Sequence, residues 1–153
     1  MEDTFIYDVK FLDNGNAYAI GSDKLFFINI HDGVKDDIPF GSRYLRTYAF
    51  HRSQGIALAL SANPDGRSCD LLSFDANGKN DCEIATEEKV ISLSMRDNDR
   101  AILSADKITV YDKNGTLRGT VKTDSDARKI VYSDRDTFYV LGKSRISKLW
   151  LEG

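Results

Sequence analysis

Several residue types are scarce in this sequence, and each scarcity removes a class of protein. The 153 residues include only two cysteines and two histidines, too few for a disulfide framework, and His31 and His51 share no local spacing that would hold a metal ion. No apolar run approaches the roughly 18–20 residues that cross a bilayer as a helix. We therefore expect no metal site and no membrane span within this chain.

Groups that would activate a substrate are also scarce. No serine lies in a nucleophile elbow, and no glycine-rich phosphate loop is present. Acidic clusters are frequent, but none has the glycine bend and later bidentate carboxylate of a calcium loop, so turn formation and solvation explain them. These clusters are Asp36–Asp37, Glu87–Glu88, Asp97–Asp99, Asp124–Asp126 and Asp134–Asp136. The net charge of −3 provides no field that favours nucleic acid. We expect no catalysis, no cofactor and no nucleic-acid partner.

The two cysteines, Cys69 and Cys82, flank a hairpin turn at Asn77-Gly78. An ideal hairpin centred on that turn pairs residue 69 with about residue 86, so a disulfide to Cys82 needs a bulge or a slipped register. We expect free thiols, with the bonded pair as the alternative, and the cysteines do not indicate a compartment.

The sequence is rich in one feature, an internal repeat. A short β-strand that runs into a glycine turn spans Lys107–Gly115, and the turn glycines of its copies lie 45, 37 and 38 residues apart. That period is typical of propeller blades and solenoid units. The weaker copies are Leu25–Gly33, Asp70–Gly78 and Arg145–Gly153. The predicted repeats cover residues 5–40, 44–85, 89–123 and 127–153 of a single domain, residues 1–153.

Each repeat has the same order of strands and turns, with about fifteen strands in all. The second strands, such as Ile56–Leu60, Ala101–Leu103 and Phe138–Leu141, are apolar on consecutive residues, which predicts burial on both faces. The fourth strands are charged, and Val34–Phe40 carries a proline at its end, which is typical of an exposed edge strand.

A repeated four-stranded antiparallel unit, buried on both faces and polar at its outer edge, is the blade of a β-propeller. In segments such as Ile108–Gly115 the chain resembles bacterial β-propeller repeat proteins of the general YVTN/WD-like class. Most of all, it is similar to a Firmicute family with an N-terminal membrane anchor and an extracytoplasmic propeller. The resemblance implies an all-β fold of four successive four-stranded blades, and an extracytoplasmic, membrane-anchored full-length protein. Without that resemblance a cytoplasmic location is expected.

The fourth repeat stops early. Gly153 matches the glycine that precedes a fourth strand, and residues 1–4 are too few to replace that strand. We therefore expect the last blade to lack its outer strand, and the chain to be part of a larger propeller. Two open blade faces would expose more apolar surface than a soluble monomer normally does, which predicts self-association through these faces.

Residues 43–52 differ in character from the rest, with three arginines, a histidine, three aromatic residues and no acid. Such interleaving can bind anions, sugars or single-stranded nucleic acid. We expect instead an innermost strand whose aromatic side chains pack between blades.

A binding surface is predicted on one end of the sheets. Successive turns of a meander alternate between two ends, so the turns after the second strands share a face with the links between blades. That face carries an insertion at residues 63–68, and inserted loops often mark binding, although a turn without a ligand is the alternative. The candidate ligand-binding residues are Arg43, Asn63, Asp65, Arg67, Glu87, Asp124 and Asp126.

These features favour a non-catalytic binding or interaction scaffold, for a protein or small-ligand partner that the sequence does not identify. The alternative is a piece of a propeller enzyme, a hydrolase or lyase, whose active site lies partly in blades outside this chain. Function resides in sites and not in the fold, so both hypotheses are kept.

Overall fold

Within residues 4–151, the part of the chain that the structure describes, the computed structural model contains fifteen β-strands and no helix. Neighbouring strands pair antiparallel in four meanders, three with four strands and the last with three. The first sheet contains β1 (Ile6–Phe11), β2 (Asn16–Gly21), β3 (Lys24–Asn29) and β4 (Gly33–Pro39). The second contains β5 (Tyr44–His51), β6 (Gly55–Ser61), β7 (Cys69–Asp75) and β8 (Asn80–Thr86). The third contains β9 (Ser92–Arg96), β10 (Asp99–Ser104), β11 (Lys107–Asp112) and β12 (Leu117–Lys122). The fourth contains β13 (Lys129–Asp134), β14 (Thr137–Leu141) and β15 (Ile146–Trp150).

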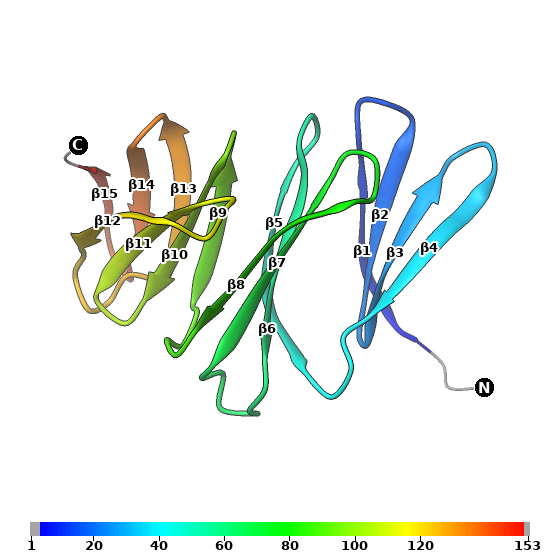
Figure 1. Ribbon diagram of the computed structural model, residues 1–153. Coiled ribbons are helices and arrows are strands. Elements are labelled where there is room, and N and C mark those ends of the chain that lie inside the picture. Colours follow the sequence, from blue (N-terminus) through cyan, green and yellow to red (C-terminus); the bar gives the residue numbers. More distant parts are fainter. Residues whose placement is uncertain (1–3, 152–153) are drawn as a thin grey trace.

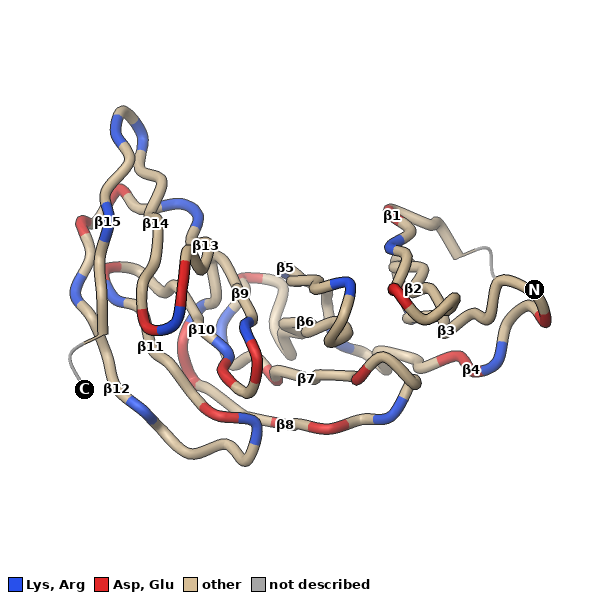
Figure 2. The backbone as a smooth tube through the Cα atoms, turned by 90° about the horizontal axis from the view of Figure 1, so that it is seen from above, with Lys and Arg blue, Asp and Glu red and all other residues tan. Residues whose placement is uncertain are grey.

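The four sheets follow one another face to face, with the first and the fourth at opposite ends of the row (Figure 1). Seen from above, the row bends into an open arc (Figure 2). Three apolar cores fill the spaces between successive sheets, one core for each pair. Within the described residues, the predicted all-β architecture of four successive propeller-type sheets is confirmed, and the last sheet has three strands.

The glycine turns that defined the repeat are built by one local device. The Asp112 carboxylate accepts hydrogen bonds from the backbone N–H groups of Asn114 and Thr116, at 2.9 and 3.0 Å. Asp75 caps the equivalent turn in the second sheet in the same way. Gly115 has φ of 82°, a left-handed conformation that costs glycine little. These turns are therefore closed by residues only a few positions apart in the sequence.

The second strands are buried as predicted in the middle of the row but not at its end. Every residue of β6 is buried, because sheets cover both of its faces. In β14, Phe138 and Val140 are buried against the third sheet, but Tyr139 is exposed. The prediction of burial on both faces is therefore wrong for residues 138–141, because no described segment covers the outer face of the fourth sheet.

The cysteine geometry agrees with the expected hairpin register. Cys69 pairs with Thr86, and a bulge between Ser73 and Phe74 brings Cys82 opposite Ser73. Both thiols are free and buried, and burial raises the pKa of the Cys82 thiol. The cysteines therefore behave as small apolar residues of the core between the second and third sheets.

Candidate functional site

The links between sheets and the turns after the second strands lie at one end of the sheets, called here the link face (Figure 1). The link face consists of residues 22–23, 40–43, 62–68, 87–91, 105–106, 123–128 and 142–145. The predicted ligand-binding residues all lie on these segments, but the structure divides them into two groups.

The first group surrounds the inserted loop of the second sheet. The Asp65 carboxylate accepts a hydrogen bond from the backbone N–H of Arg67 at 3.0 Å. The backbone N–H of Ser68 points to the carbonyl of Glu87 at 3.4 Å, so the loop touches the link to the third sheet. Arg43 forms a 3.0 Å ion pair with Asp70. Asn63, Asp65, Arg67 and Glu87 have exposed side chains, whereas that of Arg43 is half-buried.

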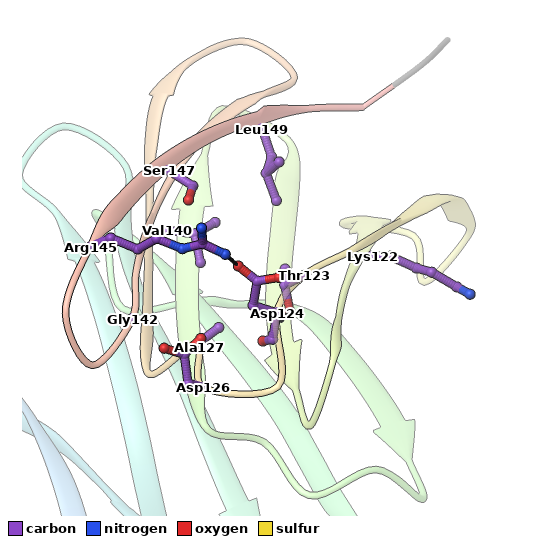
Figure 3. Close-up of a pocket in the computed structure, with 10 residues that line it drawn as sticks. All are labelled: Lys122, Thr123, Asp124, Asp126, Ala127, Val140, Gly142, Arg145, Ser147 and Leu149. Atoms are coloured by element: carbon purple, nitrogen blue, oxygen red, sulfur yellow. Dashed lines mark hydrogen bonds and ion pairs between the residues drawn. The ribbon is translucent and has the colours of Figure 1, made fainter.

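The second group, Asp124 and Asp126, lines a cavity of about 220 Å³ between the third and fourth sheets (Figure 3). Asp124 forms an ion pair with Arg145, which reaches across from the turn between β14 and β15. The Asp126 carboxylate accepts a hydrogen bond from the backbone N–H of Lys143 at 3.3 Å. The lining is completed by Lys122, Thr123, Ala127, Val140, Gly142, Ser147 and Leu149.

This lining combines one guanidinium, one lysine ammonium, two carboxylates and two hydroxyls with the apolar residues Ala127, Val140 and Leu149. Neither Thr123 nor Ser147 has a histidine beside it among the lining residues. The chemistry of the cavity suits reversible binding of a group that offers both hydrogen-bond donors and acceptors.

The opposite end of the sheets holds an ionic network that the sequence reasoning missed. Arg118 of β12 forms ion pairs with Asp99 of β10 and Asp136 of the turn after β13. Burial raises the pKa of Asp99, and the charge of Arg118 opposes that shift. Asp99 and Arg118 line a cavity of about 420 Å³ together with Arg96, Asp97, Asn98, Asp112, Tyr132 and Arg135. The acidic clusters at 97–99 and 134–136, expected to act only in turns, thus also join the third and fourth sheets.

The arginine-rich segment 43–52 consists of β5 with one flanking residue on each side. Two of its three aromatic side chains pack between sheets, whereas Tyr44 is exposed. Tyr48 and Phe50 lie against the core of the first and second sheets. The Tyr48 hydroxyl donates a 2.9 Å hydrogen bond to Asp8 of β1. Arg52 lies 3.7 Å from Asp13. The prediction that the aromatic side chains of this segment pack between sheets is therefore confirmed for Tyr48 and Phe50 and wrong for Tyr44.

The two histidines lie in exposed positions at the end opposite the link face. His51 Nδ1 lies 2.9 Å from the hydroxyl of Ser53. In the described part of the chain, no three histidine, cysteine or carboxylate side chains converge as a metal site would require. Nor does that part include a helix with the length and apolar character needed to cross a membrane.

Comparisons with known proteins agree with the architecture. The model of a family described as "Family of unknown function (DUF5711)" matches residues 1–151. No curated protein matches the chain. The crystal structure of the computationally designed Ika4 protein is similar with a TM-score of 0.74 and 12% identity, over 99% of this chain and 94% of its own. The designed Ika8 protein gives 0.72 and 14%, over 97% of this chain and 46% of its own.

BamB from Moraxella catarrhalis gives a TM-score of 0.72 and 12% identity, over 97% of this chain and 48% of its own. The chain thus spans almost the whole length of Ika4 but about half the length of Ika8 and BamB. At these identities the similarity establishes a β-propeller-like fold and carries no activity with it.

Proposed function

This chain belongs to the DUF5711 family of unknown function, and from that premise we propose that it is a non-catalytic interaction scaffold. The observation that carries the proposal is the uncovered apolar surface at both ends of the arc. The outer face of the first sheet carries Val9 and Phe11, and that of the fourth carries Val131, Tyr139 and Trp150, all exposed. Contiguous apolar faces of this kind mark protein–protein interaction sites.

The two outer faces are counterparts in the repeat. Two faces pack together in each internal core. One is the forward face of a sheet, which is directed toward the next sheet in the sequence. The other is the backward face of that next sheet. One position of the repeat shows this on the backward faces. It is occupied by Val9 paired with Ala19 in the first sheet. The equivalent pairs are Leu93 with Ile102 in the third sheet and Ile130 with Val140 in the fourth. Leu93 and Ile130 are buried in their cores, whereas Val9 is exposed. The chain therefore exposes one backward and one forward face of the kind that pack together inside it.

We infer that the forward face of the fourth sheet binds the backward face of the first sheet in a second copy. Two copies joined this way make two identical contacts related by a two-fold axis, so the assembly closes. This arrangement would extend the arc toward a larger propeller. The similarity to half of the Ika8 chain is consistent with it.

Sedimentation velocity tests the scaffold proposal. The protein is expected to associate into a two-copy complex, and Trp150→Asp is expected to abolish that association because a charge would be buried in the contact. Leu117→Asp is the matched control, since Leu117 is an exposed residue of β12, in a sheet covered on both faces. A protein that remains monomeric at all concentrations would contradict the proposal.

We also propose that the link face holds the ligand-binding surface, through Arg43, the 63–68 loop and the cavity at Asp124 and Asp126. A photo-crosslinking amino acid at Asn63 or Asp124 of the full-length protein is expected to form adducts with its partner. The same group at Lys113, at the opposite end of the sheets, is the control. Adducts from position 113 alone would assign binding to the other end.

One observation favours the enzyme alternative as a second candidate. A cavity of about 500 Å³ opens on the inner strands, lined by Lys10, Tyr48, Arg128 and Lys129 among others. An activity screen of the full-length protein, followed by Lys129→Ala, tests this alternative. Activity that Lys129→Ala removes would replace the scaffold proposal.

The extracytoplasmic, membrane-anchored location implied by the family resemblance stays a prediction for the full-length protein. Protease accessibility of the propeller in intact cells and in spheroplasts would test it. Digestion only after the membrane is opened would indicate a cytoplasmic protein.

A further inference from the structure

We propose that the free edge of β15 accepts an extended segment of a partner polypeptide as the fourth strand of the last sheet. This inference goes beyond the scaffold proposal, because it concerns a strand edge and not a sheet face. In the described part of the chain, β15 pairs with β14 on one side and with no strand on the other. In each of the other three sheets the equivalent edge is paired with a fourth strand, which is β4, β8 or β12.

Strand register identifies which residue of β15 should be covered. Ile146 pairs with Leu141 of the second strand, as Ile108 pairs with Leu103 and Leu25 with Ile20. At this position Leu25, Leu71 and Ile108 are 0%, 2% and 0% exposed. Ile146, at the same position in the fourth sheet, is 69% exposed.

The three complete sheets show the chemistry of the missing strand. The residues directly opposite this position are Ile38, Ile84 and Val121. All three are β-branched aliphatic residues, and each lies in or against the adjacent core. Their strands are otherwise largely polar or charged. The expected partner segment is therefore extended and mostly polar, with isoleucine or valine opposite Ile146.

The backbone of β15 is oriented to receive that segment. The N–H of Gly142 bonds to the carbonyl of Arg145, and the N–H of Leu151 bonds to the carbonyl of Asp136. Backbone groups alternate in direction along a strand, so those of Ile146, Lys148 and Trp150 point to the free edge. Strand addition of this type draws affinity from main-chain hydrogen bonds and specificity from alternate side chains.

A peptide with the sequence of residues 116–123, which contains β12, is the probe. Fluorescence anisotropy of the labelled peptide should show saturable binding to the protein. Trp150, the single tryptophan, is 61% exposed on β15, so its emission should shift to shorter wavelength on binding.

In the third sheet the N–H of Thr123 bonds to the carbonyl of Asp106, so by alternation the N–H of Val121 also points to β11. N-methylation of the valine of the peptide should weaken binding about tenfold or more, because it removes a hydrogen bond to the edge. N-methylation of the next lysine, whose N–H points away, should have little effect.

A variant of the protein tests the same edge from the other side. Lys148→Pro removes an N–H that faces the free edge while leaving the bonds to β14, so it should abolish peptide binding. Lys148→Thr keeps that N–H and should bind normally. Equal binding of the two N-methylated peptides, or no binding of the unmodified peptide, would overturn the proposal.

The test also separates a second copy from a peptide as the occupant. Lys148 also lies beside Tyr139 on the outer face, so Lys148→Thr is the control for the side chain. If Lys148→Pro alters the sedimentation of the protein alone and Lys148→Thr does not, a second copy occupies the edge and the proposal is overturned. Peptide binding with unchanged sedimentation supports it, even if the sheet faces prove not to associate. Because the N-methylated peptides use the unaltered protein, the proposal stays testable if Lys148→Pro does not fold.

Discussion

Ile108 and Ile146 occupy the same position of the repeat, but only Ile108 is enclosed by a following sheet. Ile108→Ala is expected to lower the free energy of unfolding by about 2–5 kcal/mol, the usual cost of emptying a packed core position. Ile146→Ala should change it by about 0.5 kcal/mol or less in the monomer. Urea unfolding of dilute protein measures both values. Similar losses for the two variants would mean that Ile146 is covered in the monomer.

Asp8 and Tyr48 join the innermost strands of the first and second sheets through one hydrogen bond. The hydrogen bond from the Tyr48 hydroxyl holds the pKa of Asp8 below its ordinary value of 3.8. Burial opposes this shift, and Lys10 lowers the pKa by less than either effect. Because the pKa is lowered in the folded state, the stabilisation is present above pH 3.8 and is lost as the pH falls through the folded-state pKa.

Tyr48→Phe should therefore destabilise the protein at neutral pH and do so less after acidification to about pH 2. Urea unfolding at the two pH values, with NMR titration of the Asp8 carboxyl group, checks this expectation. The Asp8 pKa should rise toward its ordinary value in the variant. An equal loss of stability at both pH values would assign the effect to packing of the ring.

At the scale of elements, the inserted loop is the part of the second sheet that can be removed. Most of residues 62–67 are exposed, and the loop is held mainly by its own contacts, such as Ser61 Oγ with the carbonyls of Asn63 and Arg67 at 2.8 and 2.7 Å. Shortening residues 63–68 to a two-residue turn should keep the β-sheet circular dichroism and cost about 1 kcal/mol or less, since loop length contributes weakly to stability.

Deletion of Asn114 and Gly115 is the matched control for this prediction. It removes the residues that the Asp112 cap and the left-handed backbone require, and should abolish cooperative unfolding. Loss of the fold on shortening residues 63–68 would show that this loop is structural. The sequence had already distinguished the two turns, because only the loop at 63–68 departs from the repeat.

The whole molecule can be tested by mixing variants. If association joins a fourth sheet to a first sheet, Phe11→Asp and Trp150→Asp should each abolish the two-copy complex. An equimolar mixture should regain part of it, because the intact fourth sheet of one variant meets the intact first sheet of the other. Sedimentation of the mixture measures this recovery. If like faces paired instead, each single variant would retain association and mixing would change nothing.

The ionic contacts between sheets could not be predicted from the sequence. Arg118 is 19 positions from Asp99 and 18 from Asp136, and nothing in the repeat period pairs these residues. The bond between Tyr48 and Asp8 spans 40 positions. Such pairs depend on how two sheets stack and on which rotamers the stack permits. The residues predicted to bind a ligand all lie on the link face, as the alternation of turns requires. Their division between the 63–68 loop and the Asp124 cavity depends on how the sheets stack.

The sequence by itself determined the strands, their hairpin register and their division into four sheets. These features are decided by alternation of residues along a strand and by turns such as Asp112–Gly115, in which all the interacting groups are close in the chain. Only the tertiary structure decided which apolar residues are enclosed and which charges meet. Tyr139 and Ile146 have the composition of a core, yet they are exposed because burial requires another sheet in front of them. An apolar residue is buried only when a second surface removes it from water. The sequence of a strand shows which residues are apolar, but the packing of the sheets decides which of them are covered.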